Sequence, residues 1–164
     1  MILSKIFKNT LLILAACLVL TACATKKEVA TTADIQGQMQ SDVYTGTDSV
    51  EYLADGVPDR VFFATNESIL TTASRETLRS QAAWLRKNSS INVVLEGHAD
   101  ERGTREYNLA LGERRANAIA ELLIINGVSK ANIMTVSYGE EKPSARGSNE
   151  SSWSKNRRAL IKTF

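Results

Sequence analysis

Two kinds of apolar spacing alternate along residues 60–164, and this alternation restricts the fold more than any other feature of the chain. Short runs rich in β-branched and aromatic residues are typical of strands, whereas apolar residues three or four positions apart indicate helices. Strands are expected at 60–65, 91–97, 132–139 and 157–164, and helices at 71–88 and 104–126. The order β-α-β-α-β-β predicts an α+β domain whose helices pack on a small mixed sheet.

Local signals set the ends of the two helices. Thr71 or Thr72 is a suitable N-cap for the first, and Asn126-Gly127 is a good C-cap signal for the second. Gly112 interrupts the second helical pattern, where a glycine costs about 1 kcal/mol relative to alanine. Two alternatives follow: a break that restarts near Gly112, or one continuous helix that tolerates it. Residues 140–155 are expected to form a loop.

The N-terminus has the pattern of a secretory signal. Lys5 and Lys8 precede an apolar run at 11–20, and small residues follow up to Cys23. The apolar run is shorter than the ~20 residues that a transmembrane helix needs. The four residues ending at Cys23, Leu-Thr-Ala-Cys, resemble the lipobox of bacterial lipoproteins. The resemblance implies a signal peptide at 1–22, cleavage before Cys23, and a lipid on the Cys23 thiol; the alternative is ordinary signal cleavage beside an incidental cysteine.

Removal of this signal peptide changes which sites and partners the composition of the remaining chain allows. Cys17 leaves with it, so Cys23 is the remaining thiol and the folded part has no disulfide, cysteine metal site or cysteine nucleophile. The net charge of +2 comes from Lys5 and Lys8, and the rest carries 18 basic and 18 acidic residues. A balanced charge gives no electrostatic reason to expect nucleic-acid binding.

The segment that follows Cys23 lacks a sustained apolar period. Residues 23–56 are rich in Thr, Asp, Gln, Ser and Ala, which favours a lipidated N-terminus and a flexible tether over a folded element. Docking of 50–53 on the domain is the alternative. The folded domain is therefore predicted to span 57–164.

The stretch 97–123 concentrates one histidine, several acids and two adjacent arginines. His98 and Asp100 suggest a metal site, but a tight site needs about three or four ligands and His98 is the only histidine. No metal or other cofactor is therefore predicted. His98 is expected to be a structural hydrogen-bonding residue. Asp100 and Glu101 are adjacent, a poor arrangement for an acid–base pair, and no G-x-S-x-G motif is present. Recognition of a ligand is the remaining chemistry.

The same stretch resembles a known family. From Gly97 through Ala116 it follows G-H-x-D-x-x-G-x-x-x-Y-N-x-x-L-x-x-x-R-A, the signature of the OmpA-like peptidoglycan-binding domain. The terminal segment "SYGEEKP…SKNRRA" is also similar, so the resemblance covers roughly 58–164. It implies an OmpA-like fold and non-covalent binding of the meso-diaminopimelate side chain of a peptidoglycan stem peptide.

The resemblance also implies residue roles. Asp100 is expected to accept hydrogen bonds from the ligand ammonium and Arg115 to bind its carboxylate, whereas Arg114 faces solvent or an acidic side chain. The simpler alternative is an Asp100–Arg115 salt bridge that only pins the loop. Further ligand contacts are expected at Asn66, Asn108 and one basic residue, either Arg157 or Arg158.

These features together predict an outer-membrane lipoprotein whose domain lies in the periplasm and tethers the membrane to the cell wall. Ala24 follows the lipidated cysteine, where an aspartate retains some lipoproteins in the inner membrane. The resemblance implies partners in the Tol–Pal system of envelope integrity and cell division, TolB among them. The alternative from another class is a lipid-anchored enzyme that acts on peptidoglycan, with Asp100 or Glu101 as general acid.

Overall fold

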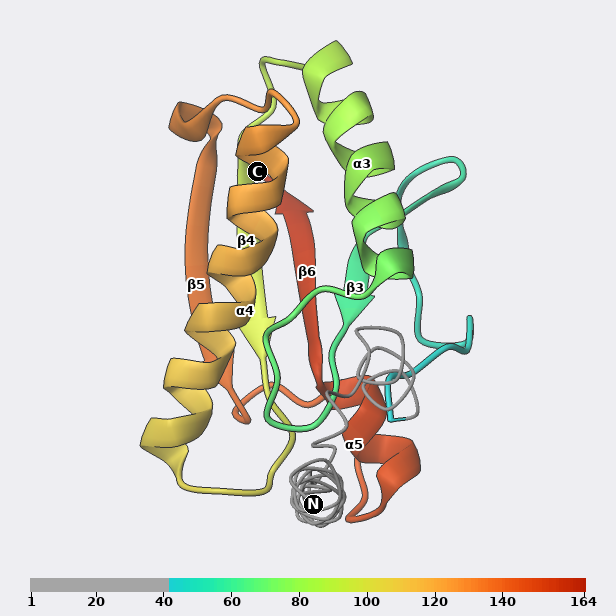
Figure 1. The fold of residues 1–164 in the computed structure, drawn as a ribbon, viewed down its shortest axis with the longest axis vertical. Coiled ribbons are helices and arrows are strands. Elements are labelled where there is room, and N and C mark those ends of the chain that lie inside the picture. The colour runs from blue at the N-terminus through green and yellow to red at the C-terminus, as the bar shows by residue number, and fades with distance from the viewer. Residues whose placement is uncertain (1–41) are drawn as a thin grey trace, which may run out of the picture. The chain divides into compact units, whose positions relative to one another are not determined.

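The computed structural model describes residues 42–164, in which helices and strands alternate as Figure 1 shows. In chain order the elements are β1 (Tyr52–Ala54), β2 (Val57–Pro58), β3 (Arg60–Phe62), α3 (Thr72–Lys87), β4 (Val93–His98), α4 (Arg105–Ile125), a 3-10 turn (Lys130–Asn132), β5 (Ile133–Gly139), α5 (Glu150–Asn156) and β6 (Arg158–Thr163). The predicted α+β class and the order of the main elements are confirmed. The signal peptide and Cys23 lie outside the described residues.

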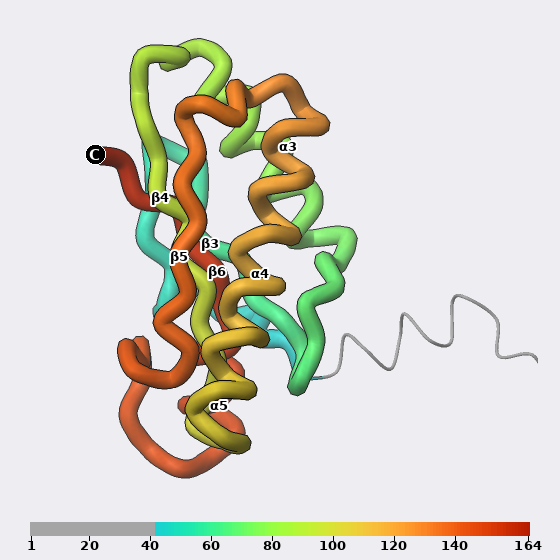
Figure 2. Tube along the Cα trace, turned by 90° about the vertical axis from the view of Figure 1, so that its left-hand side faces the viewer, coloured from blue at the N-terminus to red at the C-terminus, as the bar shows by residue number. Residues whose placement is uncertain are grey.

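Within residues 42–164, β3, β6, β4 and β5 form a mixed sheet in that spatial order. Strand β6 runs antiparallel to both β3 and β4, and β5 runs parallel to β4. Helices α3 and α4 lie on the same side of this sheet (Figure 2). Their buried residues, Leu78 and Ile119 among them, pack on the apolar face of the sheet and form the core.

The caps at the start of α3 and at the end of α4 follow the sequence signals. The Thr71 hydroxyl accepts from the backbone N–H of Ser74, which identifies Thr71 as the N-cap of α3. Thr104 caps α4 in the same way through the N–H of Tyr107. Gly127, just beyond α4, has a φ of 89°, a left-handed conformation that glycine adopts without strain.

Helix α4 is continuous through Gly112, so the structure selects the unbroken alternative. A close approach between the helix and strand β4 explains the glycine. A Cβ built on Gly97 would lie 1.8 Å from the carbonyl oxygen of Gly112, and one built on Gly112 would lie 2.3 Å from Ser137 Oγ. The two glycines let α4 lie directly against the sheet, and this contact compensates for the weak helix propensity of Gly112.

Two predicted irregular segments carry structure. Strand β1 falls within the predicted tether, pairs with β2, and is accompanied by Tyr44, whose ring packs edge-to-face on Phe62 at 4.7 Å. Within residues 42–56 the structure agrees with the alternative, docking of 50–53 on the domain, because isolated apolar residues there pack on it without forming a periodic pattern. Helix α5 occupies part of the predicted 140–155 loop, and at seven residues it is too short for apolar periodicity to reveal.

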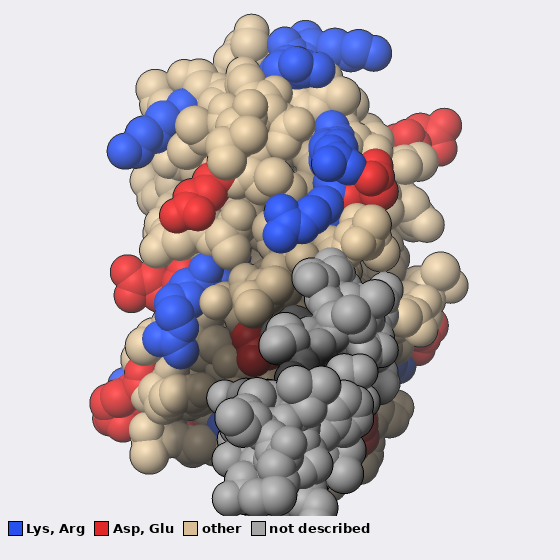
Figure 3. Space-filling view, viewed as in Figure 1, with Lys and Arg blue, Asp and Glu red and all other residues tan. Residues whose placement is uncertain are grey.

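The helix-covered face carries charges of both signs. Acidic and basic side chains are interspersed over it in the space-filling view (Figure 3). None of the helices in residues 42–164 combines the length and apolar character needed to cross a membrane.

Candidate functional site

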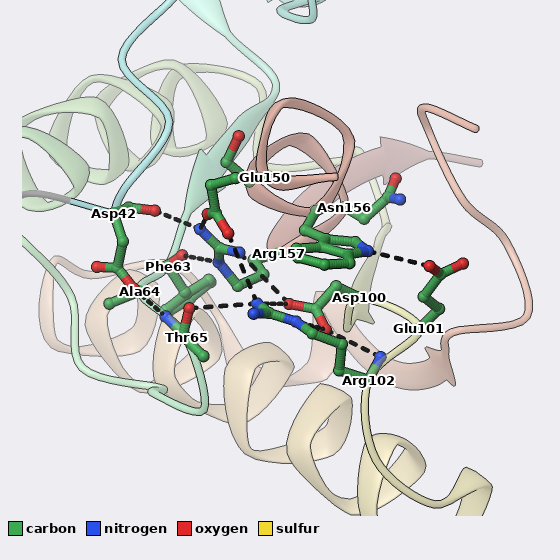
Figure 4. Close-up of polar contacts among 12 residues, drawn as sticks. Asp42, Phe63, Ala64, Thr65, Asp100, Glu101, Arg102, Glu150, Asn156 and Arg157 are labelled. Carbon is green, nitrogen blue, oxygen red and sulfur yellow. Dashed lines mark hydrogen bonds and ion pairs between the residues drawn. The ribbon is translucent and has the colours of Figure 1, made fainter. Parts of the chain in front are cut away.

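The strand directions bring four distant segments to one edge of the sheet. Because β3, β4 and β5 run the same way, the loops that follow them emerge together, and the chain enters β6 at the same edge. The residues after β3, the loop 99–104, the segment 140–149 and α5 therefore surround one region. Asp100, predicted as the ligand-binding acid, lies at its centre (Figure 4).

The carboxylate of Asp100 is buried and fully hydrogen-bonded. Its Oδ1 accepts from the backbone N–H and from Nε of Arg102, each at 3.1 Å. Its Oδ2 accepts from Nη2 of Arg102 at 2.7 Å and from Nη1 of Arg157 at 3.4 Å. The principal partner is thus Arg102, two residues further along the same loop.

These bonds control the ionisation of Asp100. Burial alone would raise the pKa of Asp100, but hydrogen bonds from the side chain and backbone N–H of Arg102 outweigh it and hold the pKa below 3.8. Asp100 is therefore a carboxylate at neutral pH.

Arg157 is the member of the Arg157-Arg158 pair that lies at this site. Its guanidinium is buried, donates from Nε to the carbonyl of Phe63 at 3.1 Å, and contacts the carboxylate of Glu150 and the carbonyl of Asp42. Arg158 begins β6 opposite Phe62 and donates to the carbonyl of Lys142 at 3.1 Å. The structure places Arg157 beside Asp100; its contact with a ligand stays a prediction.

Arg115 projects from α4 and is held by three backbone carbonyls. It donates to Glu67 at 2.8 Å, His98 at 2.7 Å and Ala64 at 3.0 Å, and so joins the segment after β3 to the end of β4. Burial lowers the pKa of Arg115 to about 9, an effect that the charge of Asp100 opposes. No Asp100–Arg115 ion pair occurs among the described residues, so the alternative prediction of a salt bridge that only pins the loop is wrong. Nη1 and Nη2 each keep a second N–H, and binding of a ligand carboxylate by Arg115 stays a prediction.

The two predicted asparagines occupy different positions. Asn108 is buried in α4, where its amide donates to the carbonyl of Arg102 at 3.1 Å and contacts the Glu140 carboxylate, so it fixes the loop that holds Asp100. Asn66 is exposed, with a left-handed φ of 58° that asparagine adopts more readily than most residues. Ligand contacts at Asn66 and Asn108 stay predictions. Arg114 is exposed, as expected, with its guanidinium carbon 5.8 Å from the Tyr107 ring centroid.

Sequence reasoning missed three residues of this site. The Arg102 guanidinium lies 4.2 Å from the ring centroid of Trp153, and its Nη2 is 3.9 Å from Glu150 Oε2. Trp153 also donates from Nε1 to Glu101 at 3.1 Å. Trp153 and Glu150 belong to α5, which the sequence did not predict. The run Asp-Glu-Arg could have predicted Arg102, because a basic residue two positions after a loop aspartate is well placed to pair with that aspartate.

The His98 side chain lies beside Tyr138 and Glu96. Its ring stacks on Tyr138 at a centroid distance of 5.6 Å, and neither ring nitrogen has a hydrogen-bond partner within the described part of the chain. The Glu96 carboxylate is near, with Oε2 3.6 Å from Nε2. The prediction that His98 serves as a hydrogen-bonding residue is wrong. Across residues 42–164 no three metal-ligating side chains are grouped together.

Comparison with known proteins identifies the family. The sequence model of the OmpA family matches residues 62–157. The chain belongs to the OmpA family. It is 42% identical over 147 residues to the peptidoglycan-associated lipoprotein of Mesorhizobium japonicum, a match covering 90% of this chain and 86% of that protein. The peptidoglycan-associated lipoprotein of Agrobacterium fabrum is 40% identical, over 95% of this chain and 88% of its own length.

Solved structures support the same fold. The peptidoglycan-associated lipoprotein from Burkholderia pseudomallei is similar with a TM-score of 0.63 and 38% identity, covering 65% of this chain and 90% of that one. The C-terminal domain of Helicobacter pylori MotB has a TM-score of 0.61 at 20% identity, which shows a shared fold alone. The predicted OmpA-like architecture is thus confirmed.

Proposed function

We propose that this chain is a lipoprotein that binds peptidoglycan non-covalently and holds the outer membrane to the cell wall. The observation that carries the proposal is the Asp100 carboxylate, buried and ionised at an edge of the sheet where four segments meet. The names of the two peptidoglycan-associated lipoproteins described above support the same ligand. The lipobox that ends at Cys23 supports the lipid anchor.

The ligand chemistry follows from the charges at this edge. The side chain of meso-diaminopimelate ends in an ammonium and a carboxylate on one carbon, so its binding site needs an acid and a planar cation close together. Asp100 supplies the acid, and Arg102, Arg115 and Arg157 supply guanidinium groups around it. Asn66 and Asn108 complete the proposed set, with Asn66 at the exposed rim.

The ionisation of the site favours binding over catalysis. A general acid must be protonated at the working pH, which requires a raised pKa. The pKa of Asp100 is lowered, as described above, and hydrogen bonds from Ser148 and Trp153 lower the pKa of Glu101. Both candidate acids of the enzyme alternative are therefore carboxylates at neutral pH, which argues against a hydrolase.

The proposal extends to place and partners. Several acyl chains on one cysteine give an effectively permanent membrane anchor, since each buried methylene contributes about 0.8 kcal/mol. Ala24 favours the outer membrane, and the family resemblance favours the Tol–Pal system, with TolB as a partner in envelope integrity and cell division.

Purified cell walls test this function. The full chain in detergent is expected to sediment with diaminopimelate-type sacculi and to release no soluble fragments from them. Release of muropeptides would favour the enzyme. Equal binding to lysine-type sacculi would contradict the diaminopimelate pocket.

A further inference from the structure

The Asp100 carboxylate has no hydrogen-bonding capacity left for a ligand. A carboxylate accepts about two hydrogen bonds at each oxygen in its own plane. Both oxygens of Asp100 already have this number, three of the four coming from Arg102 and the fourth from Arg157. An ammonium that binds Asp100 must first displace one of these arginines.

The two arginines differ in their freedom to move. The Arg157 side chain is 1% exposed and is also held by Phe63 and Glu150, whereas the Arg102 side chain is 38% exposed. Arg102 also has neighbours on its outer side. Trp153 lies against its guanidinium, and Thr65 Oγ1 accepts from Nη2 at 3.3 Å. Arg102 is therefore the partner that can turn away from Asp100 and remain at the site.

We propose that Arg102 is a displaceable internal cation on Asp100 and that it selects ligands bearing an ammonium and a carboxylate on the same carbon. This inference rests on the proposed function. The ligand ammonium replaces Arg102 on Asp100, and the released guanidinium, still against Trp153, binds the adjacent ligand carboxylate. The Asp100–Arg102 ion pair of the free protein is thus replaced by two ion pairs in the complex, Asp100 with the ligand ammonium and Arg102 with the ligand carboxylate.

Selectivity follows from the exchange. A lysine side chain brings an ammonium alone, so it removes Arg102 from Asp100 and offers no ligand carboxylate in return, which leaves the guanidinium with its longer contact to Glu150 at 3.9 Å. The hydrogen bonds lost by a charged group then offset those that the ammonium gains. Arg115 cannot make this exchange, because three backbone carbonyls hold its buried guanidinium in place. Its remaining N–H donors can bind the ligand carboxylate without any change of partner.

The test compares two soluble stem peptides that differ in one residue, meso-diaminopimelate or L-lysine, by calorimetric titration of the full chain in detergent. The unsubstituted protein is expected to bind the diaminopimelate peptide at least tenfold more tightly. Arg102→Gln frees Asp100 and removes the carboxylate partner, so the lysine peptide gains affinity, the diaminopimelate peptide loses it, and the two constants come within about threefold. Arg102→Lys keeps a cation and is expected to retain a preference for diaminopimelate.

Arg79→Gln on α3, where Arg79 pairs with Glu76, is the matched control and is expected to bind both peptides normally. In a Trp84→Phe background, the diaminopimelate peptide is also expected to change the fluorescence of Trp153 as Arg102 turns against it. Equal weakening of both peptides by Arg102→Gln, with selectivity intact, would overturn the inference. Failure of the unsubstituted protein to bind the diaminopimelate peptide would instead overturn the proposed function.

Discussion

Substitution of His98 should remove most of the pH dependence of stability between pH 5 and 7. Burial and the positive charges of Arg158, Lys162 and Lys142 lower the pKa of His98 from 6.5 to about 3. Between these values the unfolded chain binds a proton that the folded domain does not, so the folded state loses stability as the pH falls below 6.5.

The magnitude follows from the width of this window. Each pH unit well inside it changes the free energy of unfolding by about 1.4 kcal/mol, so the loss from pH 7 to pH 5 is about 2 kcal/mol. His98 is the only histidine in the chain, and histidine is the side chain whose ordinary pKa falls in this range. Asp100 does not interfere, because its lowered pKa affects stability only as the pH falls below 3.8.

Urea denaturation followed by tryptophan fluorescence at pH 5, 6 and 7 measures this loss directly. The unsubstituted protein should lose about 2 kcal/mol, and His98→Gln should lose less than about 0.5 kcal/mol, whatever its stability at pH 7. If both proteins lose the same amount, or if the unsubstituted protein loses none, His98 is not held neutral by its surroundings and the reasoning fails.

Two further predictions concern the helix–sheet contact and the anchor. Gly97→Ala should lower the free energy of unfolding by about 3 kcal/mol in urea denaturation, because the new Cβ would meet the Gly112 carbonyl at 1.8 Å; a loss below about 0.5 kcal/mol would show that α4 moves aside easily. Cys23→Ser should abolish acylation and leave the chain soluble in the periplasm or as an uncleaved precursor, and continued fractionation of this variant with outer membranes would contradict the lipoprotein assignment.

The sequence predicted the long elements because their patterns repeat. Helix α3 carries apolar residues at helical spacing after its N-cap Thr71, and β4 has a continuous apolar run, so local signals and the fold agree. The short elements β1 and α5 depend on tertiary contacts instead. Trp153 in α5, for example, is placed by Arg102 and Glu101 from a distant loop.

The sequence predicted where the candidate site lies better than it predicted which arginine pairs with Asp100. The motif placed Asp100 and Arg115 at the same edge, yet which arginine pairs with Asp100 depends on the path of the loop and on β6. Arg157 and Arg158 are adjacent, and neighbouring residues at a strand point to opposite faces. Sequence alone could not tell which of them faces Asp100, because that depends on the register of β6 against β3.

Titration of the Asp100→Asn chain with a soluble diaminopimelate stem peptide tests the central claim most directly. Loss of the carboxylate removes charge-assisted bonds of roughly 1.5–3 kcal/mol, so the affinity should fall by about one to two orders of magnitude. Arg114→Ala, whose exposed side chain packs on Tyr107, should bind normally, and both variants should keep a cooperative thermal transition. Asp100→Asn binding with the affinity of the unsubstituted protein would contradict the assignment of Asp100 as the acid that binds the ligand ammonium.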